Sequence, residues 1–511
     1  MTAARPSLRR VLRRLAAAGL LTPGAIWAFG VTAAGGGVNL ASLLRFAARR
    51  RGDAAALVDA GEPTSFNALA AQVERIAAAL RDVHGVRPGD VVAVLAHNGA
   101  GLVRAVFAAS RLGARVTLLN PEMSPPQLAA LILRHHPTLV ITEADTQPLL
   151  AGAACPSITA AELLERAAAV YRRLRPVNGG ELVVLTGGTT GEPKAASRKP
   201  SPRSFALLFI HLVTALGLDR HPAAYLAAPL FHGYGVAAYL VALALGRTVY
   251  LVPRFKAADA CALIRRERLE VVAVVPSMLQ RMLAEPGADL TSLQCVISGG
   301  AALPAPVAVE TRRRLGEVLF NLYGTSEAGV AVFATPADLA AAPDTIGRPI
   351  WGVHVTIRDD AGAVLPDGQL GRICVQSRAA VKPGAWIETG DVGLRDAAGR
   401  LFVRGRIDDM IVSGGENVAP WEVESVLLTH PEVREAVAVG VPDPDFGQRL
   451  AAFVSLRPGS TLTAEALGAW LAERVARYQR PRSIELRDEL PLTAIGKVDK
   501  RALASPPPPT G

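Results

Sequence analysis

The sequence predicts an α/β protein of two or more domains, with parallel strands and helices in layers. At 511 residues, the chain is too long for a single hydrophobic core. Short apolar runs alternate with longer amphipathic segments, an order that is typical of parallel strands joined by helices. Half of the residues are hydrophobic and 20% are charged, which is an ordinary balance for a globular protein.

The alternation is clearest before the middle of the chain. The expected strands there are Asp90–Leu95, Ala114–Leu119 and Thr138–Ile141, and the expected helices are Asn67–Val83 and Ala100–Leu112. The same pattern continues further on, with expected strands at Thr248–Val252, Val271–Val275 and Gln294–Ile297. Because strands joined by helices run parallel, several strand ends are expected to meet at one edge of a sheet.

The positive charge of the chain is confined to its N-terminus. The net charge is +10, but residues 1–51 contain nine arginines and no acidic residue, so the other 460 residues are close to neutral. A chain that binds nucleic acid usually carries its basic residues on a folded surface of the domain itself. A role with nucleic acid is therefore disfavoured.

An amphipathic helix is expected after Ser7, with leucines and Val11 on one face and arginines on the other. The uncharged stretch Leu15–Leu44 follows, interrupted by Pro23 and several glycines. We interpret residues 1–39 first as a basic extension that rests on an anionic membrane. A signal peptide and a poorly ordered extension are the alternatives.

The stretch Leu182–Lys194 combines an apolar strand with a loop that is suited to polyphosphate. Its glycines let backbone N–H groups converge on an anion, and its threonine hydroxyls add further donors. Lys194 adds a positive charge, and the common P-loop pattern cannot be aligned with these residues. The candidate phosphate-binding residues are Thr186, Gly188, Thr189, Thr190, Gly191 and Lys194.

The later motif NLYGTSEAG is also suited to a nucleotide. Tyr323 offers a flat face to a purine, and Gly324 lets the chain turn beneath it. Thr325 and Ser326 supply hydroxyl donors for phosphate. Glu327 supplies an oxygen ligand for Mg²⁺, which needs few protein ligands when phosphates provide the rest. Further along, Asp391 in the motif ETGD can accept hydrogen bonds from ribose hydroxyls.

These motifs, in this order, resemble the AMP-forming adenylating enzymes, the superfamily of acyl-CoA synthetases, adenylation domains and luciferases. The string TGGTTGEPK is similar to the signature of that family, and the resemblance covers roughly residues 40–503. Two positions depart from the usual pattern. Gly187 stands where serine is common, and Ala195 stands where glycine usually follows the lysine.

The resemblance implies roles for further residues. It places Gly300 and Ala301 against the adenine, and Arg406 beside the ribose or phosphate. His232, in the motif FHGYG, would gate the acyl pocket and the pantetheine tunnel. Lys497 would reach the α-phosphate and the substrate carboxylate during adenylation. Asp408 would be the hinge about which the small domain rotates, bringing Gly414 and Gly415 to the pantetheine arm.

The implied function is that of an acyl-CoA synthetase using ATP, Mg²⁺ and coenzyme A. Small residues at Gly233, Ala237, Gly299, Ala328 and Gly329 favour a medium- or long-chain fatty acid as substrate. The alternatives are an aryl-acid CoA ligase and a fatty-acyl-AMP ligase that loads a carrier protein. A non-enzymatic acyl-nucleotide binder at a membrane is a further alternative, suggested by Gly187 and Ala195.

The same resemblance implies the domain organisation. Residues 40–407 would form a large N-terminal adenylating domain of layered α/β sheets, and residues 408–504 a small, mobile α+β C-terminal domain. Residues 505–511 would form a disordered proline-rich tail. A cytoplasmic protein with peripheral membrane contact is expected. The sequence leaves the oligomeric state open.

Overall fold

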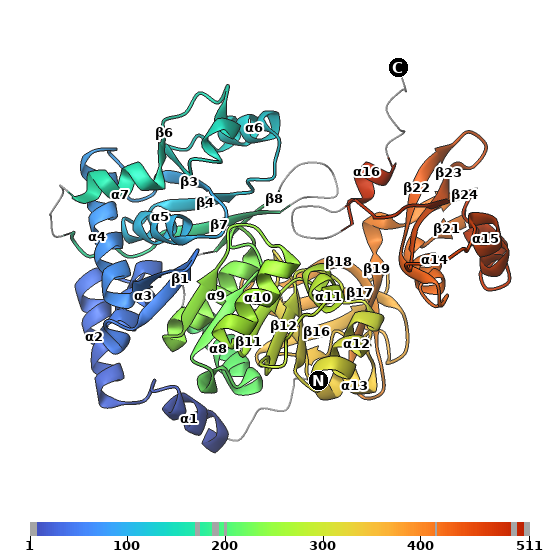
Figure 1. Cartoon of the computed structure of the whole chain (residues 1–511), viewed down its shortest axis with the longest axis horizontal. Coiled ribbons are helices and arrows are strands. Elements are labelled where there is room, and N and C mark those ends of the chain that lie inside the picture. Colours follow the sequence, from blue (N-terminus) through green and yellow to red (C-terminus); the bar gives the residue numbers. More distant parts are fainter. Residues whose placement is uncertain are drawn as a thin grey trace. The chain divides into compact units, whose positions relative to one another are not determined.

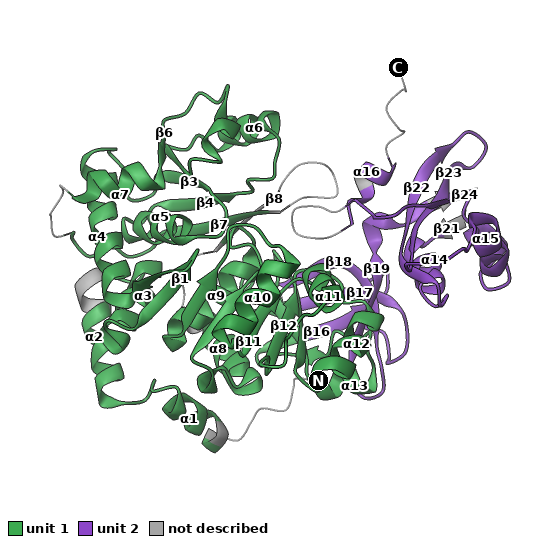
Figure 2. Cartoon of the chain, in the orientation of Figure 1, with its two compact units in different colours: residues 1–354, 376–385 green, residues 355–375, 386–511 purple. Residues whose placement is uncertain are grey.

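The computed structural model describes residues 8–168, 174–186, 194–198, 202–413, 416–491 and 498–504. The chain divides into two compact units (Figure 2): unit 1 comprises residues 1–354 and 376–385, and unit 2 comprises residues 355–375 and 386–511. The boundary expected at Asp408 falls inside unit 2, so the rotation of the chain beyond this residue stays a prediction.

Helices and strands alternate along the chain (Figure 1). The α-helices are α1 (Leu8–Ala17), α2 (Pro23–Gly36), α3 (Leu40–Arg51), α4 (Phe66–Asp82), α5 (Ala100–Arg111), α6 (Pro125–His135), α7 (Ala160–Ala168), α8 (Pro202–Leu216), α9 (Gly233–Leu245), α10 (Ala257–Glu267), α11 (Pro276–Ala284), α12 (Ala305–Leu315), α13 (Pro336–Ala341), α14 (Pro420–Leu427), α15 (Ala464–Ala472) and α16 (Lys500–Ala504).

The strands of unit 1 form sheets A and B. Sheet A has the order β15-β14-β13-β12-β11-β9-β10-β1-β2, and sheet B the order β6-β5-β3-β4-β7-β8. Their bounds are β1 (Ala55–Asp59), β2 (Glu62–Ser65), β3 (Val91–Leu95), β4 (Arg115–Leu119), β5 (Leu139–Thr142), β6 (Ser157–Thr159), β7 (Glu181–Thr186), β8 (Lys194–Arg198), β9 (Ala223–Leu226), β10 (Thr248–Leu251), β11 (Val271–Val274), β12 (Cys295–Gly299), β13 (Leu319–Thr325), β14 (Gly329–Ala334) and β15 (Arg348–Pro349).

The expected strands and helices are confirmed, with small shifts at their ends. The interior strands of both sheets pair in parallel, as the alternation predicts. Strand β3 is a nearly unbroken apolar run because α5 packs against this sheet and leaves it little contact with solvent. Helix α4 begins where the Ser65 hydroxyl accepts a hydrogen bond from the N–H of Ala68 at 3.1 Å.

A buried histidine lies in the core of unit 1. His211, on α8, contacts Trp351 at 4.4 Å and Phe333 at 5.5 Å between ring centroids, in both cases edge to face. Neither ring nitrogen has a hydrogen-bond partner among the described residues. Burial lowers the pKa of His211 from 6.5 to about 4, because a charged imidazolium would lose its hydration there.

Unit 2 contains most of sheet C, of order β16-β17-β18-β19, and all of sheet D, in which β21-β20-β23-β22 follow one another and β24 also pairs with β23. Their bounds are β16 (Val353–Arg358), β17 (Gly371–Ser377), β18 (Trp386–Arg395), β19 (Leu401–Arg406), β20 (Ile411–Ser413), β21 (Glu416–Val418), β22 (Val433–Asp443), β23 (Gly447–Leu456) and β24 (Ser483–Leu486). The long pair β22–β23 has an apolar core on each face. This arrangement gives the α+β character that the sequence predicts.

Candidate active site

Three of four neighbouring strands of sheet A carry predicted site segments at their carboxyl ends. Strands β9, β11, β12 and β13 are adjacent and parallel, so their carboxyl ends meet at one edge. The loop before His232 follows β9, Gly300 and Ala301 follow β12, and the segment ending at Glu327 follows β13. Ligands of open parallel sheets commonly bind at this edge. The structure therefore brings together segments that are about 100 residues apart in the sequence.

The β13–β14 turn presents Glu327 on a rigid backbone. A Cβ on Gly324 would lie 2.2 Å from the carbonyl oxygen of Gly329, so only glycine fits at position 324. The hydroxyl of Thr325 accepts a hydrogen bond from the N–H of Ala328 at 3.1 Å. The side chain of Glu327 is exposed, whereas Tyr323 and Ser326 are half-buried. An exposed carboxylate on a fixed turn is a suitable ligand for a hard cation.

The turn after β12 is closed by a tyrosine ring. The hydroxyl of Tyr234 donates a hydrogen bond to the carbonyl of Ile297 at 2.7 Å. A Cβ on Gly299 would lie 3.1 Å from the Tyr234 ring, and Gly300 has a φ of +80°. Gly235 is equally constrained, since a Cβ there would lie 2.1 Å from the carbonyl oxygen of Pro229. These glycines therefore allow close packing of the backbone and the ring.

This packing accounts for three of the five small residues that suggested room for a long acyl chain. The space beside Gly299 is occupied by the Tyr234 ring, and Ala328 is completely buried. Gly329 has a φ of +77° and lies against Gly324, so its lack of a side chain serves the turn. The sequence could not separate glycines that line a cavity from glycines that allow close packing.

Asn98 is a residue of this site that sequence reasoning missed. Its amide nitrogen donates to the carbonyl of Ala228 at 3.1 Å, and its amide oxygen accepts from the N–H of Leu230 at 2.7 Å. Asn98 lies just after β3 of sheet B, and it is buried, so one side chain fixes the loop that follows β9 of sheet A. The signal in the sequence was a polar residue three positions after the end of a buried apolar strand.

That loop ends at His232, which occupies the N-cap position of α9. The His232 ring lies 4.8 Å from the ring of Phe231, with an interplanar angle of 53°. The structure thus places His232 among aromatic side chains at the edge of sheet A. This position is compatible with the gating role inferred from the resemblance, which stays a prediction.

The phosphate-binding loop is described only at its two ends. Thr186 and Lys194 pair directly across the antiparallel strands β7 and β8, so the loop between them closes a hairpin at an edge of sheet B. Ala195 pairs with Leu185. Gly187, Gly188, Thr189, Thr190 and Gly191 lie outside the described residues. Their roles stay predictions.

In unit 2 the two predicted ribose ligands contact each other. Asp391 and Arg406 are directly opposite on β18 and β19, and Nη1 of Arg406 donates to Oδ1 of Asp391 at 3.0 Å. Nη2 of Arg406 also donates to Asp408 at 3.3 Å. Burial alone would lower the pKa of Arg406, but the carboxylates of Asp391 and Asp408 outweigh it and raise this pKa. The guanidinium therefore bridges the predicted ribose site and the predicted hinge.

Residues near Asp408 contact helices α14 and α16 of unit 2. A Cβ on Gly405 would lie 1.7 Å from Cδ1 of Trp421, so the indole of α14 packs directly on the backbone of β19. The indole N–H of Trp421 is buried and has no hydrogen-bond partner among the described residues. Lys500, on α16, pairs with Asp409 at 2.9 Å and with Glu424 at 3.1 Å. Gly414, Gly415 and Lys497 lie outside the described residues.

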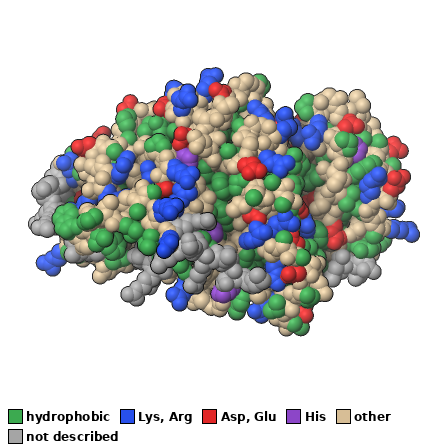
Figure 3. Space-filling view, turned by 90° about the horizontal axis from the view of Figure 1, so that it is seen from below, with side chains coloured by type: hydrophobic (Ala, Val, Ile, Leu, Met, Phe, Trp, Pro, Cys, Tyr) green, Lys and Arg blue, Asp and Glu red, His purple; other side chains and the backbone are tan. Residues whose placement is uncertain are grey.

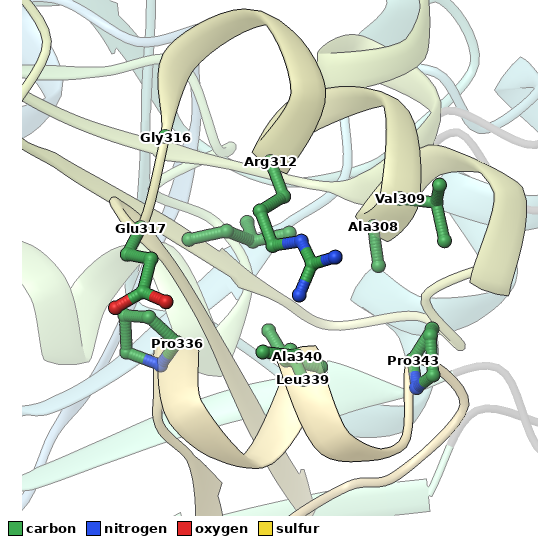
Figure 4. A pocket seen from close by; sticks show the side chains of 10 residues that line it. Ala308, Val309, Arg312, Gly316, Glu317, Pro336, Leu339, Ala340 and Pro343 are labelled. Carbon is green, nitrogen blue, oxygen red and sulfur yellow. The ribbon is translucent and has the colours of Figure 1, made fainter.

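Unit 1 has a hollow between α12 and α13 (Figure 4). Arg312 reaches over its middle, Leu339 and Ala340 lie across from Arg312, and Glu317 and Pro343 lie at its two ends. None of the predicted site residues lines this hollow. We assign it no part in the site.

Comparison with known proteins agrees with the motifs. Residues 44–384 match the family model "AMP-binding enzyme", and residues 422–497 match "AMP-binding enzyme C-terminal domain". An indoleacetate–CoA ligase of Aromatoleum aromaticum is 33% identical over 473 residues, covering 85% of this chain and 92% of that protein. A feruloyl-CoA synthase of an Amycolatopsis species is 33% identical over 480 residues, covering 89% and 96%. The solved o-succinylbenzoate CoA synthetase of Bacillus subtilis with its acyl-adenylate intermediate has a TM-score of 0.79 and 28% identity, covering 91% and 98%.

Proposed function

We propose, from the premise that this chain belongs to the AMP-binding enzyme family and is an AMP-forming acid–CoA ligase, that its acid substrate carries an aromatic ring. The reaction would convert ATP, the acid and CoA into an acyl-CoA, AMP and pyrophosphate. This substrate class replaces the fatty acid expected first and corresponds to the aryl-acid alternative.

The main support is the substrates in the names of the relatives. Indoleacetate, ferulate and succinylbenzoate all contain an aromatic ring, and the relatives named for them cover most of this chain. The edge of sheet A adds a physical argument. Phe231 and His232, in the segment between β9 and α9, have rings 4.8 Å apart, and such rings stack favourably on an aryl group.

In the first step, a carboxylate oxygen of the acid attacks the α-phosphate of ATP, and pyrophosphate leaves as the acyl-adenylate forms. Both reactants are anions, so the site has to supply positive charge and in-line positioning. We assign the β- and γ-phosphates to Lys194 and the loop amides, and the attacking oxygen and α-phosphate to Lys497. Glu327 would hold Mg²⁺, which neutralises phosphate charge when bound.

In the second step, the CoA thiolate attacks the acyl carbonyl, the C–O bond to the phosphate breaks, and AMP leaves. Lys497 has no task in this step and would obstruct the thiol. We therefore propose that the chain beyond Asp408 rotates between the two steps, withdrawing Lys497 and bringing Gly414 and Gly415 toward the pantetheine arm.

The test is pyrophosphate release by the purified full chain with ATP, Mg²⁺ and pairs of aromatic and linear acids matched in carbon number, with and without CoA. Turnover that requires CoA and favours the aromatic member of each pair is expected. A preference for the linear acids would overturn the proposed substrate class. Release of a single equivalent, with acyl-AMP retained in the presence of CoA, would instead favour a carrier protein as the acceptor.

A further inference from the structure

Helix α2 packs its small side chains against the rest of unit 1 and exposes its large ones. Ala25 and Ala28 face the protein and are 3% and 2% exposed, whereas Ile26 and Trp27 are each 63% exposed and Phe29 is 59% exposed. A surface helix of a globular protein usually has the opposite pattern, with its large apolar side chains buried. Three large apolar side chains exposed within four residues therefore indicate a surface that binds another molecule or a membrane.

Two further large apolar side chains of the N-terminal segment are exposed. Leu12 on α1 and Leu21 before α2 are also exposed. We call these five residues the α1–α2 surface: Leu12, Leu21, Ile26, Trp27 and Phe29. Figure 3, which views the molecule from the side on which α1 lies in Figure 1, shows hydrophobic side chains gathered together with basic ones toward one end.

Basic side chains border the α1–α2 surface. Arg13 is exposed on α1, and Arg49 is exposed on α3, with its guanidinium carbon 5.7 Å from the centre of the Trp27 ring. Other arginines of this region are used inside the protein, since Arg14 pairs with Asp219 and Arg50 donates to the carbonyls of Ala18 and Ala244. No acidic residue occurs among residues 1–51, so nothing in this segment offsets the positive charge.

We propose that the α1–α2 surface docks on the surface of an anionic lipid bilayer. Apolar side chains of this size enter the boundary between headgroups and acyl chains, and the arginines beside them match anionic headgroups. Trp27 with Arg49 is a pair suited to that boundary, because an indole ring favours the membrane interface. No described helix is long and apolar enough to cross a bilayer, so docking is peripheral.

The charge of this segment favours lipid over a second copy of this chain. Docking two copies through the same surface would bring two arginine-rich segments together, and their repulsion opposes association. In addition, α1 and α2 precede residue 44, where the match to the family model begins, so they lie outside the part shared with the catalytic family. The proposal does not depend on which acid is activated.

The proposal is tested by flotation of the full chain with two kinds of vesicles, one of phosphatidylcholine alone and one of phosphatidylcholine with an equal part of phosphatidylglycerol. Binding to the anionic vesicles is expected, with weaker binding at high salt, because salt screens the arginines. The triple variant I26S/W27S/F29S should bind roughly tenfold to hundredfold more weakly, since it loses three large apolar side chains. R13Q/R49Q should weaken the preference for anionic vesicles, because it removes two of the nine arginines of this segment.

A matched control is L133S/V309S, which changes exposed apolar residues elsewhere in unit 1 and should leave vesicle binding unchanged. Pyrophosphate release without vesicles should be unaffected in all these variants, which separates this proposal from the proposed function. Equal vesicle binding by the triple variant would overturn the proposal. The proposal would also be overturned if the unaltered protein bound no vesicles and formed a dimer that the triple variant does not form. A second copy of the chain would then cover the surface.

Discussion

The guanidinium of Arg406 joins Asp391 on the neighbouring strand to Asp408 at the predicted hinge. These contacts are 3.0 and 3.3 Å long, and they use the two terminal nitrogens of one planar group. Lysine cannot reproduce this fork, since it has one ammonium group on a flexible stem.

We therefore expect R406K to raise the KM for ATP about tenfold and to lower the free energy of unfolding by only about 1 kcal/mol, because the side chain is partly exposed and screened by water. Steady-state kinetics and urea unfolding measure the two effects. R404K, on the same strand, is the control and should leave the KM for ATP unchanged. An unchanged KM in R406K would remove Arg406 from the nucleotide site.

Asn98 should act through the loop that it holds. N98A leaves the carbonyl of Ala228 and the N–H of Leu230 buried without their partner, which costs about 1–3 kcal/mol. We expect kcat/KM for the acid to fall about tenfold, since the loop carrying His232 loses its fixed position. The KM for ATP should change much less. N67A removes an exposed amide contact to Asp53 and should alter neither. A fall in stability alone would give Asn98 a structural role.

His211 should make the protein less stable in mild acid. Its pKa is about 4 in the native protein and 6.5 when it is exposed, so the unfolded chain binds a proton in this window that the native chain does not. Stability is highest above pH 6.5 and falls as the pH drops toward 4, by about 3 kcal/mol in all.

The variant H211F keeps an aromatic ring against Trp351 and should show a smaller loss of stability across this window. Urea unfolding of both proteins at several pH values measures the difference. H354F changes an exposed histidine of the same unit and is the control. The same pH dependence in H211F and in the unaltered protein would contradict the assignment.

Lys497 should be required in only one of the two half-reactions. K497A should abolish formation of the acyl-adenylate, whereas transfer of the acyl group from supplied acyl-AMP to CoA should stay within about threefold of normal. The two half-reactions can be measured separately, by pyrophosphate release and by loss of the CoA thiol. Equal loss of both would contradict the proposed rotation about Asp408.

The sequence predicted the parallel layers well, because they depend on local patterns. Apolar runs gave β3, β4 and β11 within a residue or two. The pairing of Asp391 with Arg406 was added by the structure. Contacts between distant segments could not be predicted. Asn98 reaches a loop 130 residues away, and Tyr234 fills the space beside Gly299. The small residues could not indicate the substrate class, because the residue that occupies the space beside a glycine depends on the fold.

The packing of Trp421 on Gly405 has a consequence for the rate of the reaction. If the chain beyond Asp408 rotates, the indole has to leave β19 and return in every catalytic cycle. Its buried N–H, which has no partner among the described residues, regains a hydrogen bond to water on leaving, so that part of the cost of separation is offset. Any side chain at position 405 would displace the indole permanently. The missing side chain at Gly405 would thus influence the equilibrium between the adenylate-forming and thioester-forming conformations.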